Sequence, residues 1–301
     1  MSYYGSVPEL PDITVYVEAL DARVVGQPLL EASIGTPFLL RTVEPGLSDL
    51  AGRKVEGVHR IGKRIALDFE GDLHAVLHLM IAGRLDWLKK GQRVARTKNL
   101  LAVFDFPNGT LTLTEAGSKK RASLHIVRGA DAMKQFERGG IEPLDMSLDE
   151  FKHQLRRENH TIKRSLTDPR LFSGIGNAYS DEILHRARLS PVKLTSRLTD
   201  DEIERAYVAT QSVLREWTER MRADTQGEFP EKVTAFREEM AVHGKYGKPC
   251  PVCGTAVQRI RYADNETNYC PRCQTDGRLL ADRALSRLLK QDWPKRIEEL
   301  E

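Results

Sequence analysis

Cysteine is almost absent from this chain, and its absence excludes a disulfide-stabilised fold. The sequence of 301 residues has four cysteines, and all four lie between positions 250 and 273. Proteins that rely on disulfides belong to oxidising compartments. Because no cysteine remains to cross-link the rest of the chain, we expect a protein of a reducing compartment, the cytoplasm.

Long apolar runs and a dominant charge are also missing. The sequence has no run of roughly 18 apolar residues, the length that a membrane-spanning helix needs. The segment Met1–Ser6 has neither the basic start nor the apolar stretch of a secretory signal. The 46 basic residues nearly balance the 43 acidic ones, giving a net charge of +3. This balance permits nucleic-acid binding without predicting it, and we expect no membrane association.

The apolar residues that are present suffice for two domains of ordinary size. Hydrophobic residues make up 40% of the chain and charged residues 30%, as in globular proteins. The pattern changes at Gly139-Gly140, because strands are predicted before this point and helices after it. We therefore expect an α+β fold.

Alternating apolar residues predict antiparallel strands between the first helix and Val127. Gly71-Asp72 marks one turn, and Asn108-Gly109 is a strong signal for a second hairpin. Several such strands favour a sandwich or a barrel-like β domain. The predicted strands are 65–69, 73–79, 101–106, 110–114 and 123–127.

Capping signals and helical periodicity predict the helices. Ser147 with Glu150, and Thr199 with Glu202, have the spacing of capping boxes. The glycine-rich stretch Gly174–Tyr179 is predicted to be a hairpin that leads into a helix. The predicted helices run from Pro8 to about Gly26, from Ser147 to Arg157, from Thr161 to Asp168, from Ser180 to Arg188 and from Thr199 to about Ala223.

The first helix begins with the stretch Pro8-Glu9-Leu10-Pro11-Asp12. If the mature chain begins at Pro8, its nitrogen is a free secondary amine. An α-amine has a pKa of roughly 7.7–8.0, and the positive end of the helix lowers that pKa further. Such an amine can attack an electrophilic carbon and form an imine, with Glu9 as the acid. The alternative interpretation is an ordinary capped helix start.

The cysteines form two pairs with the spacing of metal ligands. Cys250-Pro-Val-Cys253 and Cys270-Pro-Arg-Cys273 are separated by residues 254–269. Two such pairs fit a tetrahedral four-thiolate zinc site, whereas a redox dithiol would need only one pair. Four thiolates leave no open position for water, so we predict one structural Zn²⁺ that stabilises a small finger.

In the order of its motifs the chain resembles the formamidopyrimidine-DNA glycosylase/endonuclease VIII family of bacterial base-excision repair enzymes. The resemblance covers nearly the whole chain from Pro8 onwards. Each motif is weak alone, and the ordered set is specific. Besides the proline-containing start and the cysteine pairs, the motifs are Gly62-Lys63-Arg64, His78-Leu79, Glu142-Pro143-Leu144, Thr161-Ile162-Lys163 and Gly174-Ile175-Gly176-Asn177.

The resemblance implies an architecture and an activity. It implies a helix and antiparallel β-sandwich in a catalytic domain over residues 8–130, a helix–two-turn–helix DNA-binding domain over 140–235, and a zinc-ribbon finger over 240–285. The implied activity is that of a bifunctional DNA glycosylase/AP lyase that excises damaged, in particular oxidised, bases. The implied partner is double-stranded DNA with a damaged base or an abasic site, bound by a monomer.

The resemblance also implies catalytic roles. Pro8 would attack the anomeric carbon of a flipped-out nucleotide, which fits the need of such enzymes for an extruded base. Glu9 would protonate or stabilise the sugar oxygen, and Lys63 would hold phosphate and assist strand cleavage by elimination. Asp12 completes the implied catalytic set, and stands where the family usually has glutamate.

Further residues are implied to bind DNA, because extrusion of a base requires the backbone to be held on both sides. Asn177 and the amide of Gly176 would bind phosphate at the glycine hairpin. Ile81 takes the place of the methionine that wedges into the duplex. Lys163 and His78 would add phosphate contacts, and Arg259 or Arg261 would replace the arginine of the zinc hairpin, where this chain has Asn265.

The sequence departs from the family pattern in two further places. Residues Met1–Val7 would acylate the nitrogen of Pro8, and a tertiary amide cannot form an imine. We expect that Val7 is the true initiator, decoded as methionine and then removed. In addition, the segment Glu115–Arg121 replaces the family loop that probes the opposite base.

Two other functions fit parts of the sequence. One is a non-catalytic protein that binds damaged DNA on the same scaffold, with Pro8 permanently blocked. The other is a helix–two-turn–helix module of ribosomal or topoisomerase type, which leaves the Pro-Glu-Leu-Pro start unexplained.

Overall fold

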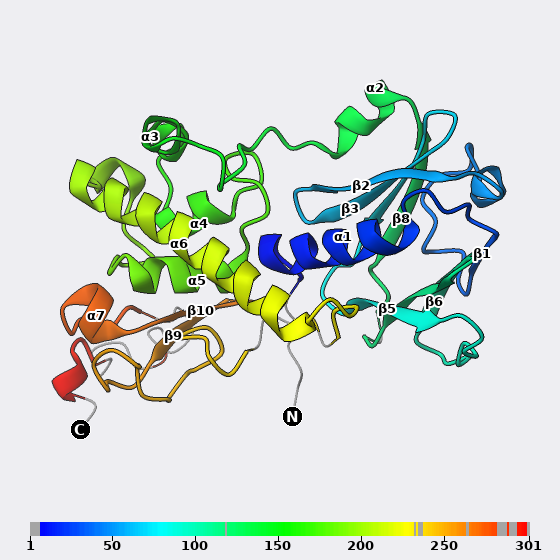
Figure 1. The fold of residues 1–301 in the computed structure, drawn as a ribbon. Helices are drawn as coiled ribbons and strands as arrows, with labels where there is room; N and C mark the ends of the chain where they lie inside the picture. The colour runs from blue at the N-terminus through cyan, green and yellow to red at the C-terminus, as the bar shows by residue number, and fades with distance from the viewer. Residues whose placement is uncertain are drawn as a thin grey trace. The chain divides into compact units, whose positions relative to one another are not determined.

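A computed structural model gives the fold of the chain (Figure 1). It describes residues 7–117, 119–231, 233, 237–262, 265–281, 288 and 294–299. These residues form two compact units. The first holds the residues up to Arg138 and those from Trp217 to Val233. The second holds Gly139–Glu216 and the residues from Arg237 onwards.

Two four-stranded antiparallel sheets make up most of the first unit. One sheet has the order β2-β3-β4-β8 and the other the order β1-β6-β7-β5. The strands are β1 (Glu31–Ile34), β2 (Val55–Ile61), β3 (Arg64–Phe69), β4 (Leu73–His78), β5 (Gly83–Lys89), β6 (Leu100–Phe106), β7 (Gly109–Glu115) and β8 (Ser123–Arg128).

Helix α1 (Leu10–Val24) packs onto this β structure (Figure 1). Ile13, Tyr16 and Leu20 are buried in the core that also contains Ile65 of β3 and Leu85 of β5. The Tyr16 hydroxyl donates to the carbonyl of Leu85 at 3.4 Å. This packing fixes the first turn of α1 relative to both sheets of the unit.

Strict alternation gives the sheet β2-β3-β4-β8 two different faces. Ile65 and Leu77 are directly paired and lie in the core with α1. Their neighbours Arg64 and His78 are also paired with each other, and they point to the opposite face because successive side chains of a strand alternate. Phe136 covers part of that opposite face.

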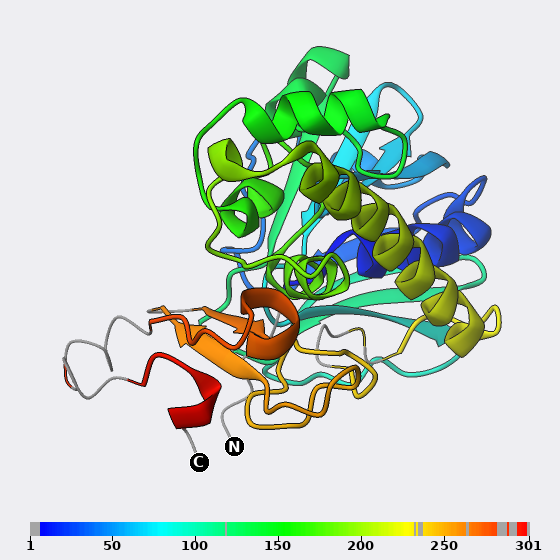
Figure 2. The same ribbon diagram turned by 90° about the vertical axis from the view of Figure 1, so that its left-hand side faces the viewer.

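The second unit combines helices with a small hairpin (Figure 2). Helix α5 lies beside β10 of the hairpin, and α7 follows the hairpin directly. The elements are α3 (Leu148–Arg156), α4 (Ile162–Thr167), α5 (Asn177–Arg186), β9 (Gln258–Arg261), β10 (Glu266–Tyr269) and α7 (Pro271–Thr275). Helix α6 (Asp200–Thr225) contributes residues to both units.

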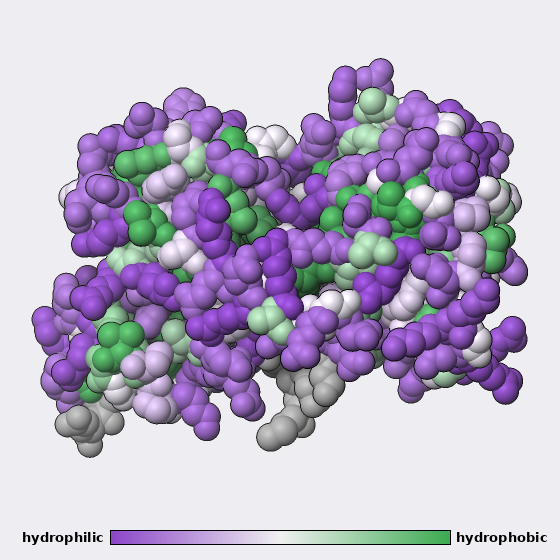
Figure 3. Space-filling view, in the orientation of Figure 1, coloured by the Kyte–Doolittle hydropathy of each residue, from purple (hydrophilic) through white to green (hydrophobic). Residues whose placement is uncertain are grey.

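Short helices complete the described part of the chain. They are η1 (Leu47–Leu50), α2 (Ala130–Met133), η2 (Lys134–Phe136), η3 (Thr195–Arg197) and η5 (Ile297–Glu299). None of the described helices is long and apolar enough to cross a membrane. Hydrophilic residues cover most of the face drawn in Figure 3, and hydrophobic residues form only small patches there.

The predicted α+β class and its elements are confirmed, with local differences. The Ser147 hydroxyl accepts a hydrogen bond from the amide of Glu150, as the capping box predicts. Helix α5 begins at Asn177, three residues before the predicted start, because the extended backbone of Gly176 already caps it. Strands β1, β2 and β5 escaped prediction; in β2 the apolar residues Val55, Val58 and Ile61 stand three apart and do not alternate.

Candidate functional site

The first turn of α1 holds two buried carboxylates directly after Pro8. Glu9 is the N-cap residue, and its amide donates to Oδ2 of Asp12 at 2.9 Å. Glu9 is 1% exposed and Asp12 is 0% exposed, and Pro8 is buried as well. Unpaired N–H groups at a helix start favour negative charge. The sequence therefore places two buried acids within the four residues that follow Pro8.

Lys63 belongs to the same cluster although it comes from a different element. It occupies the two-residue turn between β2 and β3, where Ile61 pairs with Arg64. Gly62 takes the other turn position at φ +60°, which glycine accommodates without strain. Burial lowers the pKa of Lys63, and the negative charges of Glu9 and Asp12 act to raise it. The structure thus brings Lys63 close to Glu9 and Asp12, which follow Pro8 in the chain.

The turn after β4 carries the predicted wedge residue. Ile81 is half-buried, and its neighbour Met80 has φ +53°, a left-handed conformation that is uncommon outside glycine. The Gly83 amide donates to the carbonyl of Leu79 at 3.0 Å. A Cβ on Gly83 would lie 2.2 Å from that carbonyl oxygen, so the turn requires glycine. A tight turn therefore presents two adjacent apolar side chains.

The segment Glu115–Arg121 is organised by one buried carboxylate. Glu115 is 2% exposed, and its two oxygens each accept a hydrogen bond from the Arg121 amide at 2.9 Å. Oε2 also accepts from the Ala122 amide at 3.2 Å. The Lys120 ammonium bonds to the Glu115 carbonyl and to Asn99 Oδ1. The Glu115 carboxylate thus holds the two ends of the segment together.

In the second unit, the glycine hairpin positions Asn177 at the start of α5. Gly174 has φ +79°, and Gly176 is the extended N-cap residue directly before the helix. The Asn177 side-chain amide donates to the carbonyl of Glu266 in β10 at 3.0 Å. The predicted phosphate-binding asparagine therefore contacts the zinc hairpin.

Lys163 is held from inside the protein. Its ammonium donates to the carbonyl of Asn177 at 3.1 Å and forms an ion pair with Oδ1 of Asp181. The Lys163 side chain is 11% exposed and that of Asp181 is 0% exposed. Oδ2 of Asp181 accepts from His243 Nδ1 at 2.9 Å and from the Asn268 amide at 3.1 Å. One carboxylate thus ties α4, α5 and β10 together.

Glu182, the next residue, anchors the chain that enters the zinc finger. Its carboxylate accepts from three consecutive backbone amides, those of Ala241, Val242 and His243, at 2.8–2.9 Å. Burial raises the pKa of Glu182, and these hydrogen bonds oppose the rise. Because α5 presents both Asp181 and Glu182, it fixes the finger on two sides.

The two arginines of the zinc hairpin lie on one face of β9, since one residue separates them. Arg259 approaches Glu266 Oε2 at 3.3 Å, and its guanidinium lies 4.1 Å from the centroid of the Tyr246 ring. Arg261 is exposed near the end of the hairpin. Arg259 is thus oriented by contacts of its own, and Arg261 lies at the surface.

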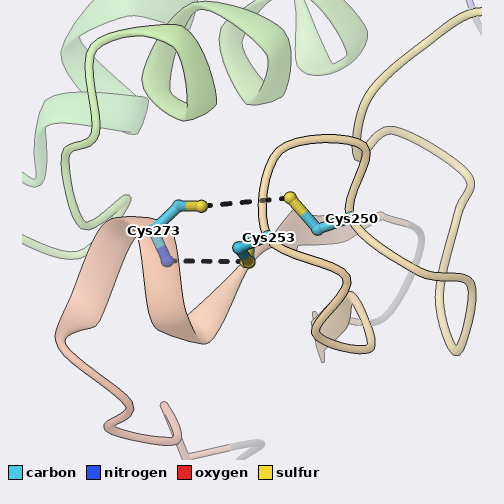
Figure 4. A group of neighbouring side chains, drawn as sticks. Cys250, Cys253 and Cys273 are labelled. Carbon is cyan, nitrogen blue, oxygen red and sulfur yellow. Dashed lines mark hydrogen bonds between the residues drawn. The ribbon is translucent and has the colours of Figure 1, made fainter.

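The four cysteines form a closed metal site. Figure 4 shows three of them, Cys250, Cys253 and Cys273. Their sulfur atoms all lie within 4.8 Å of one another, with Cys250 to Cys273 at 3.9 Å and Cys253 to Cys270 at 3.4 Å. A tetrahedral Zn²⁺ with Zn–S bonds of about 2.3 Å requires sulfur atoms about 3.8 Å apart, so the cluster fits one structural zinc ion. His185 of α5 places Nε2 3.3 Å from the Cys250 sulfur, a typical outer contact of a metal ligand.

Several residues of this arrangement were missed by sequence reasoning. Asp181, Glu182 and His185 lie on α5, where charged residues are ordinarily taken as solvent-exposed. The spacing of Asn177, Asp181 and His185, four residues apart, was a usable signal because it places the three on one helical face. The sequence offered no comparable signal for Asn268 or His243.

Known protein domains match the chain in order. Residues 7–120 match the formamidopyrimidine-DNA glycosylase N-terminal domain, and residues 140–227 match the formamidopyrimidine-DNA glycosylase H2TH domain. Residues 247–275 match the zinc finger found in FPG and IleRS.

Curated relatives match over nearly their whole length. The formamidopyrimidine-DNA glycosylase of Solibacter usitatus is 32% identical over 276 residues, which is 89% of this chain and 99% of the relative. That of Pelotomaculum thermopropionicum is 31% identical over 278 residues, with the same coverage. Lactococcus lactis FPG (MutM), solved in complex with a FAPY-dG containing DNA, aligns with a TM-score of 0.78 and 25% identity. That alignment covers 89% of this chain and 100% of the other.

Proposed function

Because the chain belongs to the formamidopyrimidine-DNA glycosylase family, we propose that it is a bifunctional DNA glycosylase/AP lyase of base-excision repair. Its substrate is double-stranded DNA that carries an oxidised base or an abasic site. The observation that carries this proposal is the buried acid pair, Glu9 and Asp12, at the helix start after Pro8, with Lys63 beside it. Relatives solved with FAPY-dG and abasic-site DNA support the substrate class.

Pro8 is the proposed nucleophile. Its deprotonated amine forms a bond to C1′ of the extruded nucleotide as the bond from C1′ to the base breaks, and the base leaves with a proton. The sugar ring opens to give an iminium ion on the Pro8 nitrogen. Glu9 lies next in the chain and supplies the proton to the ring oxygen. Asp12 holds the Glu9 amide and so orients the first turn.

Lys63 is the proposed partner in strand cleavage. Loss of a proton from C2′ of the iminium expels the 3′ phosphate by β-elimination, and a second elimination can release the 5′ phosphate. The lowered pKa of Lys63 makes its ammonium a better proton donor to a leaving phosphate. The hairpin turn holds this group at a fixed position relative to the start of α1.

The remaining predicted residues are proposed to hold the duplex. Asn177 and the amide of Gly176 bind phosphate at the start of α5, where the positive end of the helix dipole favours anions. Ile81 fills the space that the extruded base leaves. Arg261 supplies a surface charge from the zinc hairpin, with Arg259 beside it on the strand, and His78 adds a contact from β4.

Lys163 acts on DNA mainly through Asn177 in this proposal. Its ammonium is occupied by Asp181 and by the Asn177 carbonyl, so most of its hydrogen-bonding capacity serves the hairpin. We therefore assign it a positioning role, with any phosphate contact limited to its remaining N–H.

The chemistry requires a chain that begins at Pro8. The match to the family's N-terminal domain starts at residue 7, which supports initiation at Val7 and removal of the initiator methionine. The mass of the intact protein from its native host tests this step. A mass that corresponds to a chain starting at Pro8 is expected, and retention of residues 2–7 would contradict it.

The second candidate is a damaged-DNA-binding protein without catalysis. The observation that favours it is the peptide bond between Val7 and Pro8 in the sequence, which removes the amine. Borohydride trapping on abasic-site DNA separates the two functions. Protein that begins at Pro8 should give a covalent adduct that is lost in Pro8→Gly and in Glu9→Gln, and protein that begins at Met1 should give none. Duplex binding without an adduct from either form would establish the binder.

A further inference from the structure

A row of polar side chains crosses the sheet β2-β3-β4-β8 on the face turned away from the core. Arg64 of β3 pairs with His78 of β4, and His78 pairs with Ser123 of β8. Directly paired residues on one face have Cβ atoms about 4.5–5.5 Å apart. All three residues are half-buried. The register thus places a guanidinium, an imidazole and a hydroxyl side by side.

A neighbouring histidine and an aromatic ring complete the group. His125 lies two residues after Ser123 in β8, on the same face. The Phe136 ring packs edge-on against the His125 ring at 5.1 Å, and it lies 6.0 Å from the Arg64 guanidinium. Phe136 is buried, so it is a fixed support for both side chains.

The charged groups that act on this row are positive. Burial lowers the pKa of His78 to about 4, and the positive charges of Arg64, Lys63, His125 and Arg138 lower it too. Burial, Arg64 and Arg41 lower the pKa of His125 in the same way. For Arg64, burial and the charge of Arg138 lower the pKa. The neighbouring charges that shift these three pKa values are therefore all positive.

No acid in the described part of the chain neutralises the row. Among the residues that the structure describes, no ion pair or hydrogen bond involves the Arg64 guanidinium or the ring nitrogens of His78 and His125. The nearest acid on this face of β3, Asp68, lies four residues away and is bonded to His59 and His74. A half-buried guanidinium that lacks an acid partner and has other positive charges nearby is stabilised by a bound anion.

We infer that Arg64, His78 and His125 form one binding site for a phosphodiester group of the DNA backbone. Arg64 supplies the positive charge and a planar fork of donors that matches phosphate oxygens. The two histidines are neutral at physiological pH and donate one N–H each. The exposed Arg41 and Arg138 flank the site. The inference rests on the proposed DNA substrate, and it assigns the ionic contact to Arg64, leaving His78 an uncharged donor.

Equilibrium binding at several salt concentrations tests this assignment. The probe is a short duplex with a tetrahydrofuran abasic-site analogue, bound by the wild type and by Arg64→Gln, His78→Gln and His125→Gln. Each phosphate neutralised by a cation contributes about 0.9 to the slope of log K against log salt. Arg64→Gln is expected to lower the slope by about that amount and to weaken binding about tenfold near physiological salt.

The two histidine variants separate charge from hydrogen bonding. His78→Gln and His125→Gln are expected to weaken binding a few-fold with the slope unchanged, because a neutral donor releases no counterion. A fall in slope for His78→Gln as large as that for Arg64→Gln would overturn the division of roles. Unchanged slope and affinity for Arg64→Gln would overturn the site itself.

Arg128→Gln is the matched control. Arg128 is an exposed arginine at the other end of β8 and bonds to the Gly71 carbonyl at 2.7 Å. Its replacement should leave slope and affinity at wild-type values, and circular dichroism should show that all variants fold. The binding readout does not depend on the Pro8 amine. Failure of the proposed catalysis would appear as loss of borohydride trapping by wild-type protein, whereas failure of this inference would appear only in the salt slopes.

Discussion

His78 shows how one buried side chain can make the fold sensitive to acid. Burial, followed by the charges of neighbours such as Arg64 and Lys63, lowers its pKa to about 4 in the folded protein, against about 6.5 in the unfolded chain. Between these values the unfolded state binds more protons, so the free energy of unfolding falls as the pH decreases from about 6.5 to about 4. The imidazole is therefore an internal source of acid instability.

The first prediction is that His78→Gln reduces this acid sensitivity. Glutamine cannot take up a proton, so the variant should lose less stability than the wild type between pH 6.5 and 4, by on the order of 2–3 kcal/mol. Urea unfolding at a series of pH values measures the difference. Parallel pH profiles for the two proteins would contradict the depressed pKa.

For single residues, the sequence predicts the role of a side chain better than it predicts its contacts in the fold. The acid pair at Glu9 and Asp12 and the turn lysine Lys63 follow from motifs, and the structure brings them together. The internal role of Lys163 does not follow, because only the fold reveals that Asp181 lies opposite its ammonium. A motif gives a residue type and a spacing, whereas a partner from another element depends on tertiary packing.

Among the elements, helix α5 makes contacts with several other parts of the second unit. Asn177 contacts β10, Asp181 pairs with Lys163 of α4, and His185 reaches a zinc ligand. These residues stand four apart and share one face of the helix. Polar residues on a helix are ordinarily expected to face solvent. This polar face of α5 instead contacts the hairpin, helix α4 and the zinc finger.

A second prediction concerns the pair of Lys163 and Asp181. Asp181→Asn keeps an acceptor for the Asn268 amide but leaves the Lys163 ammonium buried without its counter-charge, so the unit should lose roughly 3 kcal/mol of stability. Lys163→Met in the same background should recover part of that loss. Thermal unfolding of the two single variants and the double variant gives the coupling energy, expected at about 1–3 kcal/mol. Strictly additive losses would show that the pair is not coupled.

Among the secondary-structure elements, those that bury one face in the core are the easiest to predict from the sequence. Strands β3, β4, β6, β7 and β8 were predicted because one face of each packs in the core and alternation is clear. The short edge strand β1 and the irregular β2 bury fewer residues and gave no pattern. The early start of α5 depends on the backbone of Gly176, which composition does not specify.

In the whole molecule, the first unit and the zinc finger are stabilised in different ways. The first unit has a large apolar core that joins α1 with residues of both sheets. The finger in the second unit has only a small cluster around Val242, Val257 and two cysteines. A cluster of that size does not stabilise a fold alone, so the metal supplies most of the folding energy there.

The third prediction is that chelation acts selectively. Removal of zinc should unfold the finger and release the contacts of Asn268 with Asp181 and of Glu266 with Asn177. Binding to an abasic-site duplex should then weaken at least tenfold, while the calorimetric transition of the first unit persists because its core contains no metal ligand. Calorimetry and duplex binding before and after chelation, and after zinc is restored, measure both effects. A single transition lost in one step would contradict independent stabilisation.

The sequence predicts the class of the whole fold because the ordered motifs span nearly the entire chain. The two pairs of cysteines specify a metal finger from spacing alone, since the geometry of a four-thiolate site is set by the metal. The division into units was less accessible. The residues from Trp217 to Val233 belong with the N-terminal part of the chain, and this follows from side-chain contacts such as the 5.7 Å approach of the Phe229 and Tyr16 rings.

The pairing of Arg64, His78 and Ser123 limits how this protein can change in evolution. Each of these side chains sits one position away from a core residue, so a single inserted or deleted residue in β4 would turn His78 inward and bring Leu77 to the surface. Single substitutions can therefore change the row one side chain at a time, whereas the lengths of the three strands must stay constant. We therefore expect descendants of this chain to keep the spacing of the row even where single residues in it change.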